Sequence, residues 1–216
     1  MSAITTIFGI QLKARSDDEI REWEWRNDVL PMLERAKVEP RYRNEISDWP
    51  EPKQERVFDL VTSLCKGTGA IVALVGPRGT GKTTLATQCI VRNARQGVMG
   101  YYRKCVDVIA RYKPLYADFG STDTDALMSA RNSFCRFPLV VIDELHECDE
   151  QRLKARVLPD VLDRRYAAKV DTILISNQTP EEFQQTTSDS VLSRLTEHGA
   201  IIPCEWASFR VRRNRQ

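Results

Sequence analysis

AIVALVGPRGTGKTT, residues 70–84, is the stretch of sequence that decides the fold. Its first six residues form an unbroken apolar run, which is typical of a strand buried on both faces of a parallel sheet. Residues 76–83 fit the pattern G-x-x-x-x-G-K-[ST], and a helical pattern follows over residues 82–96. Glycines let the backbone wrap tightly around phosphate oxygens with its N–H groups facing inward. The stretch therefore predicts a phosphate-binding loop between a strand and a helix.

This loop predicts a site for ATP and Mg²⁺. We expect Lys82 to place its charge on the β- and γ-phosphates and the Thr83 hydroxyl to ligate the metal. The helix that begins near Lys82 would add its positive N-terminal end. The alternative is a glycine-rich turn with a chance lysine, but a chance match has a frequency of about one in a hundred in a chain of this length. The expected nucleotide-binding residues of the loop are Gly76, Pro77, Arg78, Gly79, Thr80, Gly81, Lys82, Thr83 and Thr84.

A second apolar strand, expected over residues 139–142, ends in two acids. We expect Asp143 to hold the Mg²⁺ shell, and Glu144 to polarise a water for attack on the γ-phosphate. The alternative is a strand that ends in a solvated acidic turn, because further acids follow. Two adjacent acids favour hydrolysis over a small-molecule or nucleoside kinase, so an ATP hydrolase is the expected enzyme class.

The rest of the chain alternates strand and helix patterns, which predicts an α/β fold. We expect a mostly parallel five-stranded sheet with helices on both faces and no C-terminal helical lid. Residues 1–40 read as a short helical extension, with an apolar face over residues 17–35 that Pro31 kinks or splits. The predicted division is therefore an extension over residues 1–40 and an ATPase domain over residues 41–216. The expected strands cover residues 70–75, 98–103, 139–142, 171–176 and 200–203, and the main helices cover residues 51–66, 82–96, 106–116 and 151–168, the last with a kink or restart at Pro159.

Two further polar residues are candidates for the site. Asn177 follows the expected strand 171–176, and carboxyl ends of parallel strands face the ligand crevice. Its amide would contact the γ-phosphate or the attacking water, although an asparagine that opens a turn is the alternative. Arg194 precedes the last strand, and its spacing leaves two interpretations open: a surface charge, or a guanidinium supplied to the γ-phosphate of a neighbouring subunit.

Composition excludes several classes of protein. The chain of 216 residues has 32 basic and 30 acidic side chains, so bulk charge does not indicate a nucleic-acid binder. No apolar run approaches the length that spans a bilayer, and the N-terminus lacks the pattern of a secretory signal. The six cysteines are too widely spaced for a C-x-x-C zinc or redox motif. We expect a cytoplasmic protein with reduced thiols and no membrane partner.

The ordered set of these motifs resembles the AAA+ ATPases, and more narrowly the branch that contains DnaC-like helicase loaders and IstB-like transposition helpers. The resemblance covers residues 38–209. Besides the loop and the Asp143-Glu144 pair, it rests on Glu39–Asn44, on Asp163-Arg164-Arg165, on Ser193-Arg194-Leu195 and on Glu205-Trp206-Ala207-Ser208-Phe209-Arg210.

The resemblance implies roles for individual residues. Lys82 and Thr83 would hold nucleotide and metal, Asp143 and Glu144 would form the Walker B pair, and Asn177 would act as sensor 1. Arg194 would be the arginine finger that acts on a neighbouring subunit. The resemblance also implies that Arg210 approaches the nucleotide and that Tyr42 packs near adenine.

The function expected from this resemblance is that of a helicase loader. It would self-associate on ATP into an arc, spiral or ring, bind single-stranded DNA and deliver a replicative DNA helicase, with residues 1–40 as the grip on that partner. The alternative is an IstB-like helper that delivers a transposase, and a kinase is the alternative from another class. The short extension suggests a phage or mobile-element protein. Aromatic and basic residues mix in Tyr101-Tyr102-Arg103-Lys104 and Arg111-Tyr112-Lys113, as on a strand-tracking surface, although an ordinary amphipathic segment fits equally well.

Overall fold

The computed structural model describes residues 4–7, 10–13, 16–117, 129 and 132–209. Its centre is a five-stranded sheet in the order β4-β5-β6-β3-β7, in which all neighbours pair in parallel. The predicted five-stranded parallel sheet is therefore confirmed. The strands are β3 (Ile71–Val75), β4 (Gly100–Lys104), β5 (Leu139–Asp143), β6 (Asp171–Ser176) and β7 (Gly199–Pro203).

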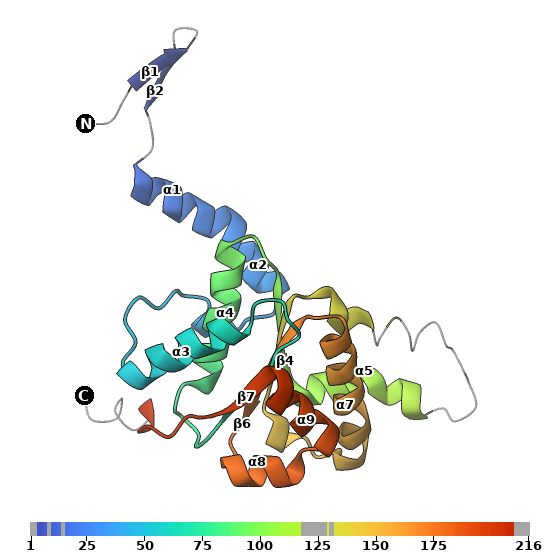
Figure 1. The fold of residues 1–216 in the computed structure, drawn as a ribbon. Coiled ribbons are helices and arrows are strands. Elements are labelled where there is room, and N and C mark those ends of the chain that lie inside the picture. The colour runs from blue at the N-terminus through green and yellow to red at the C-terminus, as the bar shows by residue number, and fades with distance from the viewer. Residues whose placement is uncertain (1–3, 8–9, 14–15, 118–128, 130–131, 210–216) are drawn as a thin grey trace.

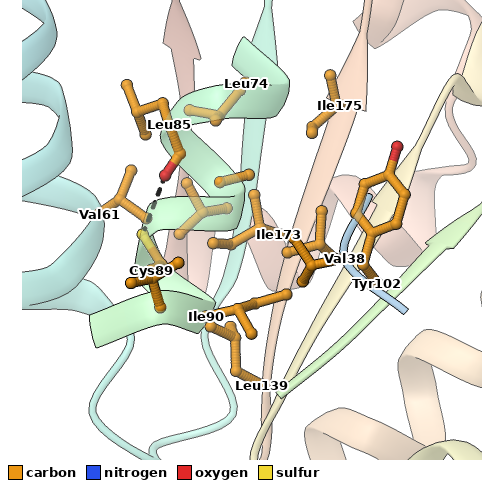
Figure 2. Close-up of a cluster of buried hydrophobic side chains, with 14 of the residues drawn as sticks. Val38, Val61, Leu74, Leu85, Cys89, Ile90, Tyr102, Leu139, Ile173 and Ile175 are labelled. Atoms are coloured by element: carbon orange, nitrogen blue, oxygen red, sulfur yellow. Dashed lines mark hydrogen bonds between the residues drawn. The ribbon is translucent and has the colours of Figure 1, made fainter. Parts of the chain in front are cut away.

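Helices cover both faces of this sheet (Figure 1). Successive residues of β3 point to opposite faces, so Val72 and Leu74 belong to one buried cluster and Ile71 and Val75 to the other. Figure 2 shows the first cluster, where Ile90 and other side chains of α4 pack toward the sheet. The covering helices are α3 (Pro52–Leu64) and α4 (Lys82–Arg95) on the first face, and α5 (Cys105–Ala117), α7 (Gln151–Ala167) and α9 (Asp189–His198) on the second.

The register brings the carboxyl ends of all five strands of this sheet to one edge. Val75, the last residue of β3, lies opposite Ser176 on one side and Pro203 on the other. Lys104, the last residue of β4, lies opposite Asp143 of β5. The loop after β3 and the polar residues after β5 and β6 therefore meet at this edge.

The N-terminal segment contains the expected helix and an element that the sequence did not predict. Strands β1 (Ile4–Ile7) and β2 (Ile10–Lys13) pair antiparallel. Helix α1 (Asp17–Glu24) continues through a π-helical turn, η1 (Trp25–Val29), into α2 (Leu30–Arg35). Pro31 lies in the first turn of α2, directly after this π-helical turn, so the helix type changes next to the residue that has no N–H to donate.

The second half of this segment is part of the main core. Val29, Leu33, Ala36 and Val38 are buried in the same cluster as Val72 of the sheet. Helix α1 instead has no buried residue, and Ile20 and Trp23 on it are 42% and 47% exposed.

Local signals explain two of the helix ends. Thr179 and Glu182 form a capping box at the start of α8 (Pro180–Thr186), and Gly97, with a φ of 73°, follows the end of α4. The expected restart at Pro159 is wrong, because α7 runs through that residue as one helix. Short 3₁₀ turns complete the described elements: η2 (Pro40–Tyr42), η3 (Phe134–Arg136) and η4 (Leu145–Glu147). Among the described residues, no helix has both the length and the apolar character needed to span a membrane.

Candidate functional site

The phosphate-loop sequence folds into a tight turn between β3 and α4. Gly76, Gly79 and Gly81 have φ angles of 135°, 85° and 83°, values that side chains with a Cβ rarely adopt. A Cβ on Gly76 would lie 2.8 Å from the carbonyl oxygen of Cys204, so only glycine fits against the chain after β7. The predicted strand, loop and helix are therefore all present.

Lys82 is buried and folded over this loop. Its Nζ donates hydrogen bonds to the carbonyl oxygens of Gly76 and Pro77, each at 2.7 Å. The ammonium group therefore lies inside the loop, where it could form a charge-assisted hydrogen bond with a bound phosphate.

Thr83 and Asp143 meet across the edge of the sheet. The Thr83 hydroxyl donates to Oδ2 of Asp143 at 2.8 Å, and the hydroxyl of Tyr102 donates to the same oxygen at 3.0 Å. Burial and the nearby carboxylate raise the pKa of the Tyr102 phenol, so it remains a donor at neutral pH. A hydroxyl and a carboxylate side by side are the hard oxygen ligands that Mg²⁺ prefers, so these residues fit the expected metal.

Glu144 is held beside Asp143 by a special backbone conformation. It adopts the left-handed region, with a φ of 58° and a ψ of 40°, and its N–H donates to Oδ1 of Asp143 at 2.7 Å. Its carboxylate accepts a hydrogen bond from Nζ of Lys104 at 3.0 Å. This hydrogen bond raises the pKa of Lys104, which stays a cation.

The sequence leaves two interpretations of the segments around Tyr102 and Tyr112, a strand-tracking surface or an ordinary amphipathic segment. The second fits these side chains better, because Tyr102 is only 5% exposed, Tyr112 is fully buried and Lys104 contacts Glu144. Tyr101 stacks on Phe137 with ring centroids 4.3 Å apart. The physical reason is the register of β4, which directs alternate side chains toward the β5 acids.

Asn177 lies at the end of β6, as expected, and contacts a residue that the sequence analysis did not single out. Its backbone N–H donates to Nδ1 of His146 at 3.3 Å, and its side-chain amide lies 3.0 Å from Nε2 of the same ring. Nε2 also lies 3.1 Å from the carboxylate of Glu147, which pairs with Arg78 of the loop at 2.6 Å.

These groups line one cavity of about 400 Å³. Tyr42 from η2 is one of its lining residues. The cavity is lined by Glu39, Arg41, Tyr42, Arg78, Gly79, Gly81, Lys82, Thr83, Thr84, Tyr102, Asp143, Glu144, Glu147, Asn177 and Phe209.

Arg194 is not part of this cavity lining. It lies on α9, where its guanidinium pairs with Asp163 at 3.3 Å and donates to the carbonyl oxygen of Ser190 at 2.7 Å. It also lies over the ring of Tyr166, 5.4 Å from the centroid. Arg210 lies outside the described residues.

Two side chains far from the loop in sequence brace its backbone. Nε1 of Trp206 and Nε2 of Gln54 both donate to the carbonyl oxygen of Thr80, at 2.6 Å and 3.1 Å. The N–H of Phe209 donates to the carbonyl oxygen of Gly79 at 2.9 Å. Trp206 was noted in the closing motif, whereas nothing in the local sequence singles out Gln54.

Comparisons with known proteins agree with this geometry. A model of the family described as IstB-like ATP binding protein matches residues 31–216. An insertion sequence IS232 putative ATP-binding protein of Bacillus thuringiensis subsp. berliner is 22% identical over 181 residues, which are 79% of this chain and 70% of that protein. The replicative helicase loader DnaC of Escherichia coli strain K12 is 24% identical over 138 residues, 63% of this chain and 55% of the loader. A crystal structure of the DnaC helicase loader matches with a TM-score of 0.60 at 21% identity, over 76% of this chain and 99% of that chain, and this likeness concerns the fold.

Proposed function

Because this chain belongs to the family of IstB-like ATP-binding proteins, related to the DnaC helicase loaders of the AAA+ class, we propose that it is an ATPase that delivers a transposase to DNA. The observation that carries the ATPase assignment is the 2.8 Å contact between Thr83 and Asp143, with Glu144 next in the chain and Lys82 in the loop. The family match and the relative from an insertion sequence favour the transposase as the partner.

In this proposal each residue of the cavity has a separate role in the binding or the hydrolysis of ATP. Thr83 and Asp143 hold Mg²⁺, which would neutralise charge on the phosphates. Lys82 and the loop N–H groups bind the β- and γ-phosphates, and Glu144 orients the attacking water. Asn177 donates its amide to the γ-phosphate or to that water.

Arg194 completes the site of a neighbouring subunit. Arg194 does not line the cavity of its own chain, which supports a role in trans, and its contacts with Asp163 and Ser190 hold the guanidinium in a defined place on α9. ATP would therefore favour assembly into an arc, spiral or ring, because each bound nucleotide joins two subunits. The assembled protein would bind single-stranded DNA, and that binding should weaken steeply with salt if Lys and Arg contact phosphates.

Two variants test the hydrolysis. Glu144→Gln should abolish turnover and leave the affinity for ATP close to the unmodified value, because the amide keeps the volume but loses the basic oxygen. Lys82→Ala should weaken binding itself. Turnover and the Kd of a non-hydrolysable ATP analogue are measured for both, and full turnover by Glu144→Gln would overturn the assignment.

A helicase loader is the second candidate function, favoured by the match to the E. coli DnaC loader. Capture from host lysate with a non-hydrolysable ATP analogue and Mg²⁺ separates the two. Stoichiometric recovery of a transposase supports the main proposal, and recovery of a hexameric replicative helicase supports the loader.

We assign the contact with that partner to the N-terminal extension, residues 1–40. The exposed Ile20 and Trp23 lie one helical turn apart on α1, which supports this assignment. Ile20→Ser with Trp23→Ser should abolish partner capture and leave ATP turnover unchanged. Leu60→Ser is the matched control, since Leu60 is 44% exposed on α3.

A further inference from the structure

His146 is a polar residue of the site that the proposed chemistry does not use. It lies in the turn η4, directly after β5, and its side chain is 20% exposed. Both ring nitrogens contact Asn177: Nδ1 accepts from its backbone N–H at 3.3 Å, and Nε2 lies 3.0 Å from its side-chain Nδ2. Because Asn177 contacts both nitrogens of the imidazole, the orientation of the His146 ring is fixed.

The contacts determine which nitrogen of the neutral ring carries the proton. A neutral imidazole has one N–H donor and one acceptor nitrogen. The N–H of Asn177 can donate to Nδ1 only if Nδ1 has a free lone pair, so the proton lies on Nε2. That proton faces the carboxylate of Glu147, 3.1 Å away, which is an acceptor.

This assignment also fixes the amide of Asn177. The oxygen and nitrogen of an amide have nearly the same size, so the hydrogen-bond network decides which faces a neighbour. In the structure Nδ2 of Asn177 lies 3.0 Å from Nε2, which would set two donors against each other if Nε2 carries the proton. The network is satisfied when the amide is turned so that its oxygen accepts from Nε2, together with the carboxylate of Glu147. The NH₂ group of Asn177 then faces the nucleotide cavity, which Asn177 lines.

We propose that His146 is a positioning residue that turns the NH₂ group of Asn177 toward the terminal phosphate. This rests on the proposed ATP site. The chain of contacts continues through Glu147 to Arg78 of the loop, so the turn η4 joins the end of β6 to the phosphate loop. His146 thereby orients the NH₂ donor of Asn177 toward the cavity and would not itself contact the nucleotide.

Nuclear magnetic resonance tests the arrangement without any need for turnover. The chain has only two histidines, so His198→Gln leaves the ring signals of His146 alone in the spectrum. Long-range ¹H–¹⁵N correlations above the titration range should give a ring protonated at Nε2. The side-chain NH₂ signals of Asn177, identified by their loss in Asn177→Ala, should shift in His146→Phe and stay close to their place in His146→Gln, which keeps a donor near Nε2. A ring protonated at Nδ1, or Asn177 signals unmoved in His146→Phe, would overturn the proposal.

The kinetics of ATP hydrolysis test whether the position of the Asn177 amide affects turnover. His146→Phe should lower kcat for ATP by on the order of tenfold to a hundredfold, with a smaller change in KM, because a misplaced donor affects the reacting geometry. His146→Gln should recover most of the loss. In an Asn177→Ala background, His146→Phe should cost less than about twofold, because the amide that it positions is already absent. Equal losses in both backgrounds would mean that His146 acts independently of Asn177, and the proposal would be wrong.

The two proposals fail in different ways. An unmodified protein without ATP turnover would overturn the proposed function, while the ring and amide signals would still decide the role of His146. Full turnover in the unmodified protein together with unchanged kcat in His146→Phe would remove the positioning role and leave the ATPase assignment intact.

Discussion

The indole Nε1 of Trp206 donates a 2.6 Å hydrogen bond to the carbonyl oxygen of Thr80, 126 residues earlier in the chain. Thr80 lies in the phosphate loop, and both groups are buried. The segment after the last strand therefore belongs to the candidate nucleotide site, because it fixes the backbone of the phosphate loop.

Trp206→Phe should weaken nucleotide binding more than its small change in volume suggests. The phenyl ring keeps most of the packing but loses the donor, so the carbonyl oxygen of Thr80 retains the hydrogen bond from Gln54 alone among the two side-chain donors. We expect a loss of about 1 kcal/mol in the free energy of unfolding and a several-fold rise in the Kd of an ATP analogue. Trp49→Phe is the control, since Trp49 packs on Phe58 and does not line the cavity. An unchanged Kd with lower stability would limit Trp206 to a packing role.

Arg194→Ala should remove hydrolysis while the subunit keeps its own nucleotide site. Mixed with Lys82→Ala, it should regain turnover, because an intact pocket then meets an intact arginine on its neighbour. The mixture of Lys82→Ala with Glu144→Gln is the control and should stay inactive, since every pocket in it is damaged. Turnover is measured across mixing ratios, and an inactive first mixture would contradict a role in trans.

Arg165 and Arg164 are adjacent in α7 and should differ sharply in their effect on stability. Arg165 is fully buried and donates to the carbonyl oxygens of Phe134, Phe137 and Asp171 and to the hydroxyl of Thr172. Burial lowers the pKa of its guanidinium to about 10, so it remains charged at neutral pH.

Arg165→Met should therefore cost on the order of 3 kcal/mol, because it leaves buried acceptors without donors. Arg164→Met removes a partly exposed pair with Asp160 and should cost less than about 1 kcal/mol. Urea unfolding of both variants measures the difference in the free energy of unfolding. Equal losses would show that the buried hydrogen bonds of Arg165 add no stability beyond that of the exposed pair.

The buried thiols should resist alkylation in the folded protein. Burial raises the pKa of Cys89, Cys105 and Cys204 to about 12. The thiolate is the reactive form, so these residues should stay unlabelled at pH 8, whereas half-buried Cys135 should react first. Mass spectrometry after iodoacetamide treatment, with and without denaturant, gives the order of labelling.

These thiols also predict how stability depends on pH. A thiol whose folded pKa lies above its unfolded value of 9.0 favours the folded state fully below pH 9. That contribution is lost as the pH rises from 9 toward 12. Cys89→Ala should reduce the alkaline loss of stability, measured by urea unfolding between pH 8 and 11, and an identical loss in the variant would contradict this origin.

The fold and the centre of the site could be predicted because their signals are local. The apolar run before Gly76, the loop glycines and Lys82 determine a strand, a turn and a helix through steric and hydrophobic effects within a few residues. The apolar strand that delivers Asp143 and Glu144 is a signal of the same kind.

Tertiary structure alone decided which distant side chains complete the site. The register of β4 against β5 directs Tyr102 and Lys104 to the two acids, whereas their composition fits a DNA-tracking surface and an ordinary amphipathic segment equally well. The contacts of His146 with Asn177, and of Trp206 and Gln54 with Thr80, join residues far apart in the chain. Sequence periodicity indicates which face of an element is buried, but a contact between two particular side chains depends on how the strands pair and how the helices pack.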